Sequence, residues 1–222
     1  MKLLLTLLLA CGVLCPTLRA QEAPRVLWGL HATPSSLINF YPRFRIGGQA
    51  VAGQYSYLLD ASYANFPTFW NNTGFRKGYH YIALRPEVRR YITTRPKDSG
   101  MPSSDYWALE CALSQLALNV VNDAYEASDG EQYSFDEATR LKRQANVHIK
   151  YGLQRTHKGK LYLDVFIGCG LRAQHITYQD ISNRVLRFDN PADEWLFNIE
   201  RTTEGWSLRP SVTMGLRLGF VL

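Results

Sequence analysis

The chain has 222 residues, of which 46% are hydrophobic, 20% charged and 13% aromatic, and its formal net charge is +6 at pH 7. This length fits one domain, or two at most, and the basic residues are scattered rather than grouped, which argues against a nucleic-acid partner. The apolar runs are shorter than the roughly 20 residues that a membrane-spanning helix needs, so helical membrane spans are excluded.

Residues 1–20 differ in composition from the rest of the chain. Lys2 is followed by an apolar run that closes on a small residue, Ala20, and this pattern indicates a secretory signal peptide that is cleaved before Gln21. Lipidation of Cys11 is the alternative reading of the same segment. Residues 21–222 then form the exported domain.

The C-terminus carries the clearest structural signal. From Leu208 to Leu222 every even position except Pro210 is a large apolar residue, and every odd position before Val221 is polar, charged or glycine. A half-buried strand alternates in this way, whereas a surface helix repeats every 3.6 residues. A strand of about fifteen residues is long for a soluble protein, where five or six is usual. This pattern is typical of a membrane β-barrel strand.

The same alternation recurs along the chain and predicts eight strands. An even number is required if both chain ends lie on the periplasmic side of a closed barrel. The sequence therefore predicts an all-β fold, an eight-stranded antiparallel transmembrane up-and-down β-barrel. The expected strands are residues 25–32, 37–47, 54–66, 79–92, 105–122, 145–156, 160–178 and 207–222.

One expected strand breaks the pattern. In residues 105–122 the apolar positions are odd at Trp107 to Leu113 and even from Leu116 to Val120. Such a change of phase indicates a β-bulge or an amphipathic helix. The neighbouring strands favour the strand with a bulge.

The connections fall into two groups by length. Short turns near residues 47–54 and 157–160, with a longer one at 94–104, are expected on the periplasmic side, and the segments 67–78, 123–141 and 179–205 outside. The first outer loop, 33–36, is short. Within the third, Ser134 to Glu137 resembles a helix capping box and predicts a short helix over Ala138–Arg143.

The polar faces of the strands carry charges of both signs. An eight-stranded barrel has a lumen that side chains fill, so charges confined there must pair, and we expect a plugged barrel rather than a channel. Arg85, Glu87 and Arg89 are the expected hub, with Arg172, Lys150 and Arg217 near enough to join. The full interior set is Arg43, Arg45, Asp60, Arg85, Glu87, Arg89, Glu110, Lys150, Asp164, Arg172, Arg209 and Arg217.

The apolar faces also have distinctive features. Aromatic residues near the strand ends resemble the interfacial girdles of membrane barrels. Cys111 and Cys169 fall on these faces two strands apart, beyond disulfide reach, so we expect free thiols. The girdle candidates are Trp28, Tyr55, Tyr63, Trp107 and Trp206.

Sequence features of an enzyme are weak. The five histidines are dispersed, and none stands at metal-ligand spacing with another, so we expect no catalytic residues, no metal and no cofactor. Ion-pair networks also imitate active sites, and structural pairing is the favoured reading of the interior charges. A surface enzyme is the least favoured alternative.

The last strand resembles the signal by which outer-membrane proteins are recognised for assembly. Thr213, Gly215, Leu218 and Phe220 supply its polar, glycine, apolar and aromatic positions, although Val221 and Leu222 follow the aromatic. This resemblance implies folding by the barrel assembly machinery in the outer membrane, with lipid around the barrel and loops at the cell surface.

Most of the exported chain resembles a family of small outer-membrane β-barrels of Bacteroidota that has no established function and is often encoded beside fimbrillins. Arg85–Tyr91 is similar to that family's Pro-Glu-x-Arg-Tyr strand, with Arg90 inserted before the tyrosine. Tyr151–Leu153 and Gly168–Gly170 resemble its hairpin and its Gly-x-Gly strand. The start of the chain departs, because Val26–Gly29 replaces the family's Thr-Asn-Leu-Leu. The resemblance implies location and fold, a link to fimbriae, and no catalytic residues.

The outer loops carry the expected function. They hold exposed aromatic residues that often mark binding surfaces, Phe69, Trp70, Phe75, Phe188 and Trp195, although packing of these rings on one another is an equally good reading. We expect a structural, adhesive or surface-binding role toward a surface or fimbrial protein. A soluble periplasmic β-barrel that binds a ligand is the main alternative.

Overall fold

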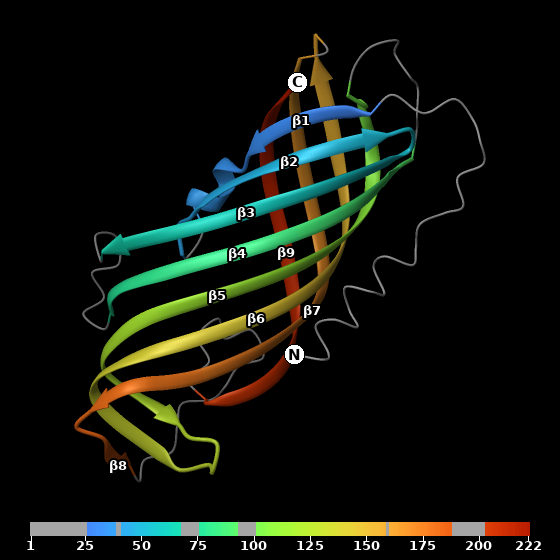
Figure 1. Ribbon diagram of the computed structural model, residues 1–222. Helices are drawn as coiled ribbons and strands as arrows, with labels where there is room; N and C mark the ends of the chain where they lie inside the picture. The colour runs from blue at the N-terminus through green and yellow to red at the C-terminus, as the bar shows by residue number, and fades with distance from the viewer. Residues whose placement is uncertain (1–25, 39–40, 68–75, 93–100, 159, 188–202) are drawn as a thin grey trace.

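The computed structural model describes residues 26–38, 41–67, 76–92, 101–158, 160–187 and 203–222 (Figure 1). The predicted signal peptide lies outside these residues. The described chain is all-β, with one short 3-10 helix, η1 (Pro34–Leu37). The strands are β1 (Leu27–Ala32), β2 (Phe44–Ala52), β3 (Tyr55–Pro67), β4 (Arg76–Tyr91), β5 (Ser104–Glu126), β6 (Gln132–His157), β7 (Leu161–Ser182), β8 (Val185–Arg187) and β9 (Gly205–Val221).

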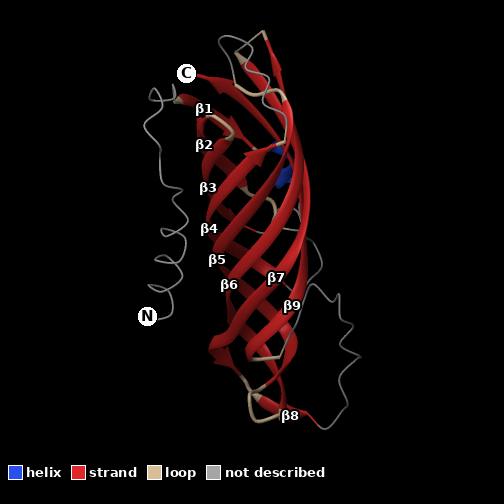
Figure 2. Cartoon of the chain, turned by 90° about the vertical axis from the view of Figure 1, so that its right-hand side faces the viewer, coloured by secondary structure: helices blue, strands red, loops and turns tan. Residues whose placement is uncertain are grey.

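Eight of the strands form a closed antiparallel ring. Each of β1 to β6 pairs with the next, β7 pairs with β9, and β9 pairs with β1. The short β8 adds to the far end of β6. The strands cross the long axis obliquely, and the two views agree on this slant (Figure 2). No described helix is long and apolar enough to cross a membrane.

The register fixes the dimensions of the ring. Following paired residues once around, from Leu218 of β9 through β1 to β7 and back, ends at Leu208, ten residues away on the same strand. This stagger, the shear of the ring, tilts the strands and sets the width of the interior. Eight strands with a stagger of this size enclose a space that side chains can fill.

Alternation decides which side chains point inward. Along β4, Tyr81, Arg85 and Glu87 are buried, while Ile82 and Leu84 between them are about half exposed. All eight ring strands follow this rule near the end that holds the C-terminus, where the outer face is apolar and the inner face carries the charges beside an apolar cluster that includes Tyr106, Tyr162 and Phe166. This end of the molecule therefore has apolar side chains outside and charged side chains inside, which is the reverse of a water-soluble fold.

Residues 105–122 form a strand, as favoured, but the expected bulge at the change of phase is absent. β5 runs from Ser104 to Glu126 without a register shift against β6, and its even residues point inward as far as Val120. The inward phase changes only at Asn122, which has φ of +50°, and beyond it Tyr125 is buried. The interior itself changes instead, from Glu110 to buried Leu116 and Leu118. The change of phase in the sequence marks the level at which the ring switches from a charged to an apolar interior.

Beyond that level, toward the end away from the C-terminus (the bottom of Figure 1), β5, β6 and β7 continue as a projecting end with an ordinary apolar core. The core residues are Leu118, Val120, Tyr125, Ala127, Phe135, Ala138, Ile176 and Tyr178. The expected helix over Ala138–Arg143 is wrong, because these residues lie in β6, opposite Val120 and Gln115 of β5. Pairing with β5 and β7 on both sides outweighs a local capping signal. The expected outer segment 123–141 is therefore mostly strand.

The boundaries of the second strand also differ from the prediction. β2 begins at Phe44 rather than residue 37, and Gly47 and Gly48 lie inside it, so the turn to β3 is at Gly53, which has φ of +60°. A Cβ at Gly47 would overlap the Asp60 carboxylate and the His31 ring. This glycine therefore makes room for an interior contact instead of forming a turn.

The junction of β1 and β9, which we call the seam, is the shortest pairing in the ring. It holds four residue pairs, from Gly29–Val221 to Ala32–Leu218. After Ala32 the chain enters η1, where the Ser35 hydroxyl accepts a hydrogen bond from the Leu216 amide at 3.0 Å. Beyond this contact, β9 pairs with β7 on one side and with no described strand on the other. The wall of the ring therefore extends least far toward the projecting end at β1 and β2.

Candidate functional site: the charged interior of the ring

Glu87 of β4 is the centre of the buried charges. Its carboxylate accepts hydrogen bonds from Arg89 Nε at 2.6 Å, Lys150 Nζ at 2.8 Å and Arg217 Nη2 at 2.8 Å. All four side chains are fully buried. The three cations come from β4, β6 and β9, so one carboxylate links three strands across the interior.

Three further carboxylates extend the set. Asp60 binds His31 Nε2 at 2.5 Å, Arg45, and Arg217 at 3.2 Å. Asp164 accepts from Arg89 at 2.7 Å, from Arg217 at 2.9 Å and from the Tyr106 hydroxyl at 2.6 Å.

Glu110 completes the set. It pairs with Lys150 and with Arg45 at 3.4 Å, lies 3.7 Å from Arg85, and contacts His148 at 3.2 Å. We call the four carboxylates with their bound cations and histidines the interior network, which consists of His31, Arg45, Asp60, Arg85, Glu87, Arg89, Glu110, His148, Lys150, Asp164 and Arg217.

The interior network is close to charge balance. Four carboxylates face five permanent cations, and every carboxylate has at least two cationic or histidine partners. A buried charge costs several kcal/mol unless it is paired and hydrogen bonded, so this mutual saturation is what allows the charges to lie in the interior. These carboxylates are all buried, with no more than 2% exposure.

Aromatic rings complete the packing of the network. The Phe166 ring lies 4.3 Å from both the Lys150 ammonium and the Arg217 guanidinium, and Tyr106 lies 4.1 Å from Arg89. Opposite Phe166 stands Gly215 of β9, where an added Cβ would come within 2.6 Å of the ring. Gly215, a position of the predicted assembly signal, therefore also gives space to the network.

The structure separates the twelve charged residues that the sequence assigned to the interior. All twelve lie on the inward face, and nine of them join the interior network. Arg43, Arg172 and Arg209 do not: Arg43 lies over the Tyr81 ring at 4.8 Å, and Arg172 donates to Ser211 at 3.1 Å. Arg209 stands directly opposite Arg172. Arg172, expected near the hub, lies nearer the projecting end than the hub does.

Sequence reasoning missed several members of the site. His31 and His148 were set aside as dispersed, yet each binds a network carboxylate. The Tyr162 hydroxyl lies 3.0 Å from His31 Nδ1. The alternation pattern placed both histidines on the polar face, and this signal was sufficient to include them. No group of His, Cys, Asp or Glu among the described residues could hold a metal ion.

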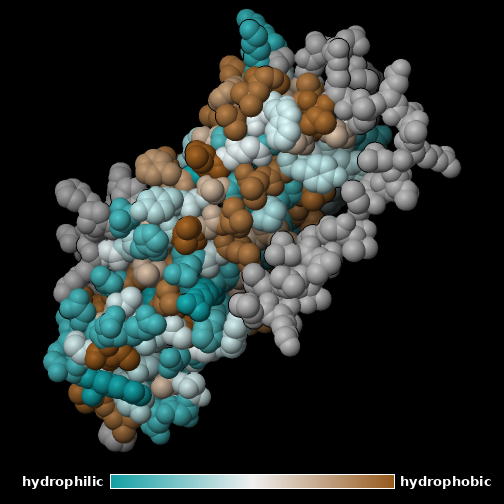
Figure 3. All heavy atoms as spheres, viewed as in Figure 1, coloured by the Kyte–Doolittle hydropathy of each residue, from teal (hydrophilic) through white to brown (hydrophobic). Residues whose placement is uncertain are grey.

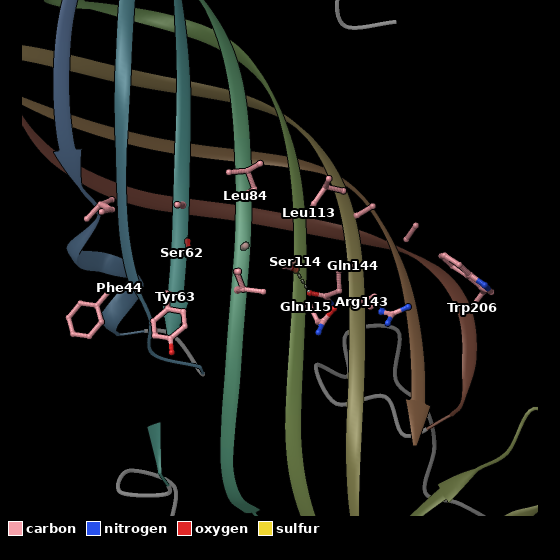
Figure 4. A pocket seen from close by; sticks show the side chains of 16 residues that line it. Phe44, Ser62, Tyr63, Leu84, Leu113, Ser114, Gln115, Arg143, Gln144 and Trp206 are labelled. Atoms are coloured by element: carbon pink, nitrogen blue, oxygen red, sulfur yellow. Dashed lines mark hydrogen bonds between the residues drawn. The ribbon is translucent and has the colours of Figure 1, made fainter. Parts of the chain in front are cut away.

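The outer face of the ring is apolar and bears a shallow groove of about 850 Å³ that crosses its strands (Figure 4). Phe44, Tyr63, Leu84 and Leu113 lie along it, with Trp206 at its far end. Figure 3 shows the same contrast over one face, hydrophobic near the end that holds the C-terminus and hydrophilic at the projecting end. The five girdle candidates are all exposed, from 38% at Tyr55 to 73% at Trp206.

The remaining expected positions are placed as follows. Thr213 points inward, whereas Leu218 and Phe220 of the predicted assembly signal are exposed on the outer face. Cys111 and Cys169 are free thiols, as predicted. The loop candidates Phe69, Trp70, Phe75, Phe188 and Trp195 lie outside the described residues.

Comparison with known proteins gives no relative. No family model, no curated protein and no solved structure matches this chain.

Proposed function

We propose that this chain is an outer-membrane β-barrel protein whose plugged, rigid barrel holds a projecting β-structure at the cell surface for a structural, adhesive or surface-binding role. One observation carries the proposal, namely the reversed polarity of the ring. Large apolar side chains such as Trp28, Ile149 and Met214 are more than half exposed outside, while charges fill the inside. In water this arrangement would expose an apolar belt, whereas in a bilayer it places apolar surface against lipid.

The topology supports the same orientation. Both described chain ends and the turns at Gly53 and Lys158 lie at one end of the ring, as in barrels with periplasmic termini. At the opposite end, the projecting part of β5, β6 and β7 has an apolar core and a polar outer face, which suits an aqueous setting. The projecting end would then stand outside the membrane.

The saturated interior supports a structural role for the barrel. A lumen filled by paired charges leaves no continuous pore, and fully buried carboxylates are out of reach of a substrate. Binding would fall to the projecting end and the outer loops. A fimbrial protein is one candidate partner, on the strength of the sequence resemblance alone.

Heat-modifiability tests the proposal. Cells that express the full chain are fractionated, membranes are extracted with detergent, and unheated and boiled samples are compared on a denaturing gel. A closed membrane barrel stays compact until it is boiled, so we expect a membrane-bound protein whose migration shifts on boiling. Release by osmotic shock as a monomer without any shift would instead support the soluble periplasmic binding protein.

A further inference from the structure

We propose that the ring contains an oxyanion-binding chamber between the interior network and the projecting end, lined by Arg43, Arg85, Arg172 and Tyr81, which takes a phosphate group. The chamber is defined by inward-facing residues. It therefore does not depend on whether lipid or water surrounds the ring.

Three guanidinium groups lie at one level of the interior, and two of them contact one phenol. Arg43 lies 4.8 Å from the centre of the Tyr81 ring, and Arg85 Nη2 donates to the Tyr81 hydroxyl at 3.2 Å. Arg172, from β7, donates to the Ser211 hydroxyl at 3.1 Å and stands opposite Asn146 of β6. Arg43 directly precedes β2, and Arg85 and Arg172 lie in β4 and β7, so the ring brings together cations that are 42 to 129 residues apart in sequence.

These cations repel one another. Arg85 lies 3.7 Å from Glu110, whereas neither Arg43 nor Arg172 forms an ion pair with a carboxylate among the described residues. Arg172 also faces Arg209 directly across the β7–β9 pair, an arrangement of like charges that destabilises a sheet. The interior network is close to charge balance, whereas the chamber carries an excess of positive charge that a bound anion would neutralise.

Unpaired polar atoms mark the same level. Buried side-chain atoms without a hydrogen-bond partner in the described part of the chain include Nε of Arg43, Arg85 and Arg172, with Ser62 Oγ and Asn146 Oδ1. Asn146 stands opposite Arg172, and Ser62 lies two residues from Asp60, which faces Arg85. Arg85 itself is 7% exposed. Asn146 Oδ1 is an acceptor, but the three guanidinium Nε atoms are donors, and buried donors normally have partners, so their presence at one level points to an anionic ligand.

The chamber is open to entry. Arg43 and Arg172 keep part of their surface exposed, unlike the network below them. The wall of the ring is lowest next to Arg43, where β2 starts at Phe44 and β9 has no described strand neighbour above the seam. An anion could arrive from solvent or on the headgroup of a lipid beside the ring.

A phosphate group fits this lining best. The guanidinium fork binds phosphate oxygens through two parallel hydrogen bonds, and a dianion matches several cations better than a single carboxylate does. Free phosphate and a lipid phosphomonoester share this chemistry. The Tyr81 hydroxyl provides a further hydrogen-bonding group beside the guanidinium groups.

Two binding measurements on the full mature chain test this inference and separate the two sources. Inorganic phosphate is titrated calorimetrically into protein in zwitterionic detergent. In parallel, thermal unfolding is followed in phosphatidylcholine nanodiscs with and without phosphatidic acid. We expect Arg172→Gln to weaken the response by about tenfold or more, the usual effect of one charge-assisted contact.

Arg143→Gln is the matched control, because Arg143 is exposed on the outer face of neighbouring β6. Without anion, Arg172→Gln should unfold at or above the temperature of the parent protein, since it removes repulsion; a purely structural arginine would lower that temperature. Arg43→Gln is the second variant if Arg172→Gln does not fold. A response to phosphate identifies a free anion, and a response to phosphatidic acid alone identifies a lipid headgroup. If neither measurement shows a response that depends on Arg172 or Arg43, the chamber is ruled out. Heat-modifiability of the same samples tests the barrel separately.

Discussion

Glu87 is the residue on which the interior charges depend most. Its carboxylate is shared by Arg89, Lys150 and Arg217, and none of these cations is accessible to water. Removing one member of a buried ion pair leaves its partners charged and uncompensated, which costs far more than the pair itself contributes. The network is thus best understood as a set of charges that tolerate burial only together.

Glu87→Gln tests this interdependence. We expect the substitution to lower the free energy of unfolding by about 3–5 kcal/mol, because three buried cations lose their shared counter-charge. Urea unfolding in detergent micelles, followed by tryptophan fluorescence, measures the change. Glu131→Gln, at an exposed position of the β5–β6 connection, is the control and should stay within about 0.5 kcal/mol of the parent. Equal stability of the two variants would show that the network is not coupled.

Gly215 offers a second test at the residue scale. An alanine there would press on the Phe166 ring, which packs against Lys150 and Arg217, so we expect a loss of about 1–3 kcal/mol from overpacking. Gly48→Ala is the matched control, because the nearest atom to an added Cβ is 3.8 Å away. Phe166→Leu in the Gly215→Ala background should recover part of the stability. A failure of Gly215→Ala to assemble that Phe166→Leu does not relieve would favour the assembly signal over packing.

The strands of the ring differ in how strongly they are held. β5 and β6 pair continuously from Ser104–Gln154 to Val121–Glu137, whereas the seam between β1 and β9 holds four pairs. Fewer shared hydrogen bonds leave a smaller barrier to local opening. The seam is therefore the element of the ring that should open first.

Hydrogen exchange measures this difference directly. Amides of Leu30 and Phe220 should exchange faster than those of Leu109 and Ile149, which lie at the centre of the β5–β6 pair. Mass spectrometry of the protein in nanodiscs resolves the corresponding peptides. Protection at the seam equal to that of β5 and β6 would contradict the idea that closure there is weak.

Sequence reasoning recovered the strands where one face stays polar and the other apolar. β4, β7 and β9 follow this rule over the halves nearer the end that holds the C-terminus, so their inward charges could be assigned correctly. It failed where local signals competed with pairing, as at Ser134–Glu137 and Gly47–Gly48. It also took the switch from Glu110 to Leu116 as a change of strand phase, because a single sequence does not show that the surroundings on both faces invert together.

At the scale of the whole molecule, the two ends of the ring differ in which face is apolar. Near the end that holds the C-terminus, apolar side chains face outward and charges face inward, and at the projecting end this order is reversed. This difference supports the proposal that lipid surrounds the first part and water the second. The boundary on β5 lies between Leu113 and Leu116.

The most direct test of this claim is a spin-label accessibility scan along the outward positions of β5. Single nitroxide labels at residues 107, 109, 111, 113, 115, 117 and 119 are compared in vesicles for collisions with oxygen and with a water-soluble nickel complex. Native Cys111 serves as one site in a Cys169→Ala protein, and each of the other labels is placed in a protein that lacks both thiols. The account predicts that oxygen dominates from 107 to 113 and nickel at 119. Nickel access at every position would show that the apolar outer face does not lie in lipid.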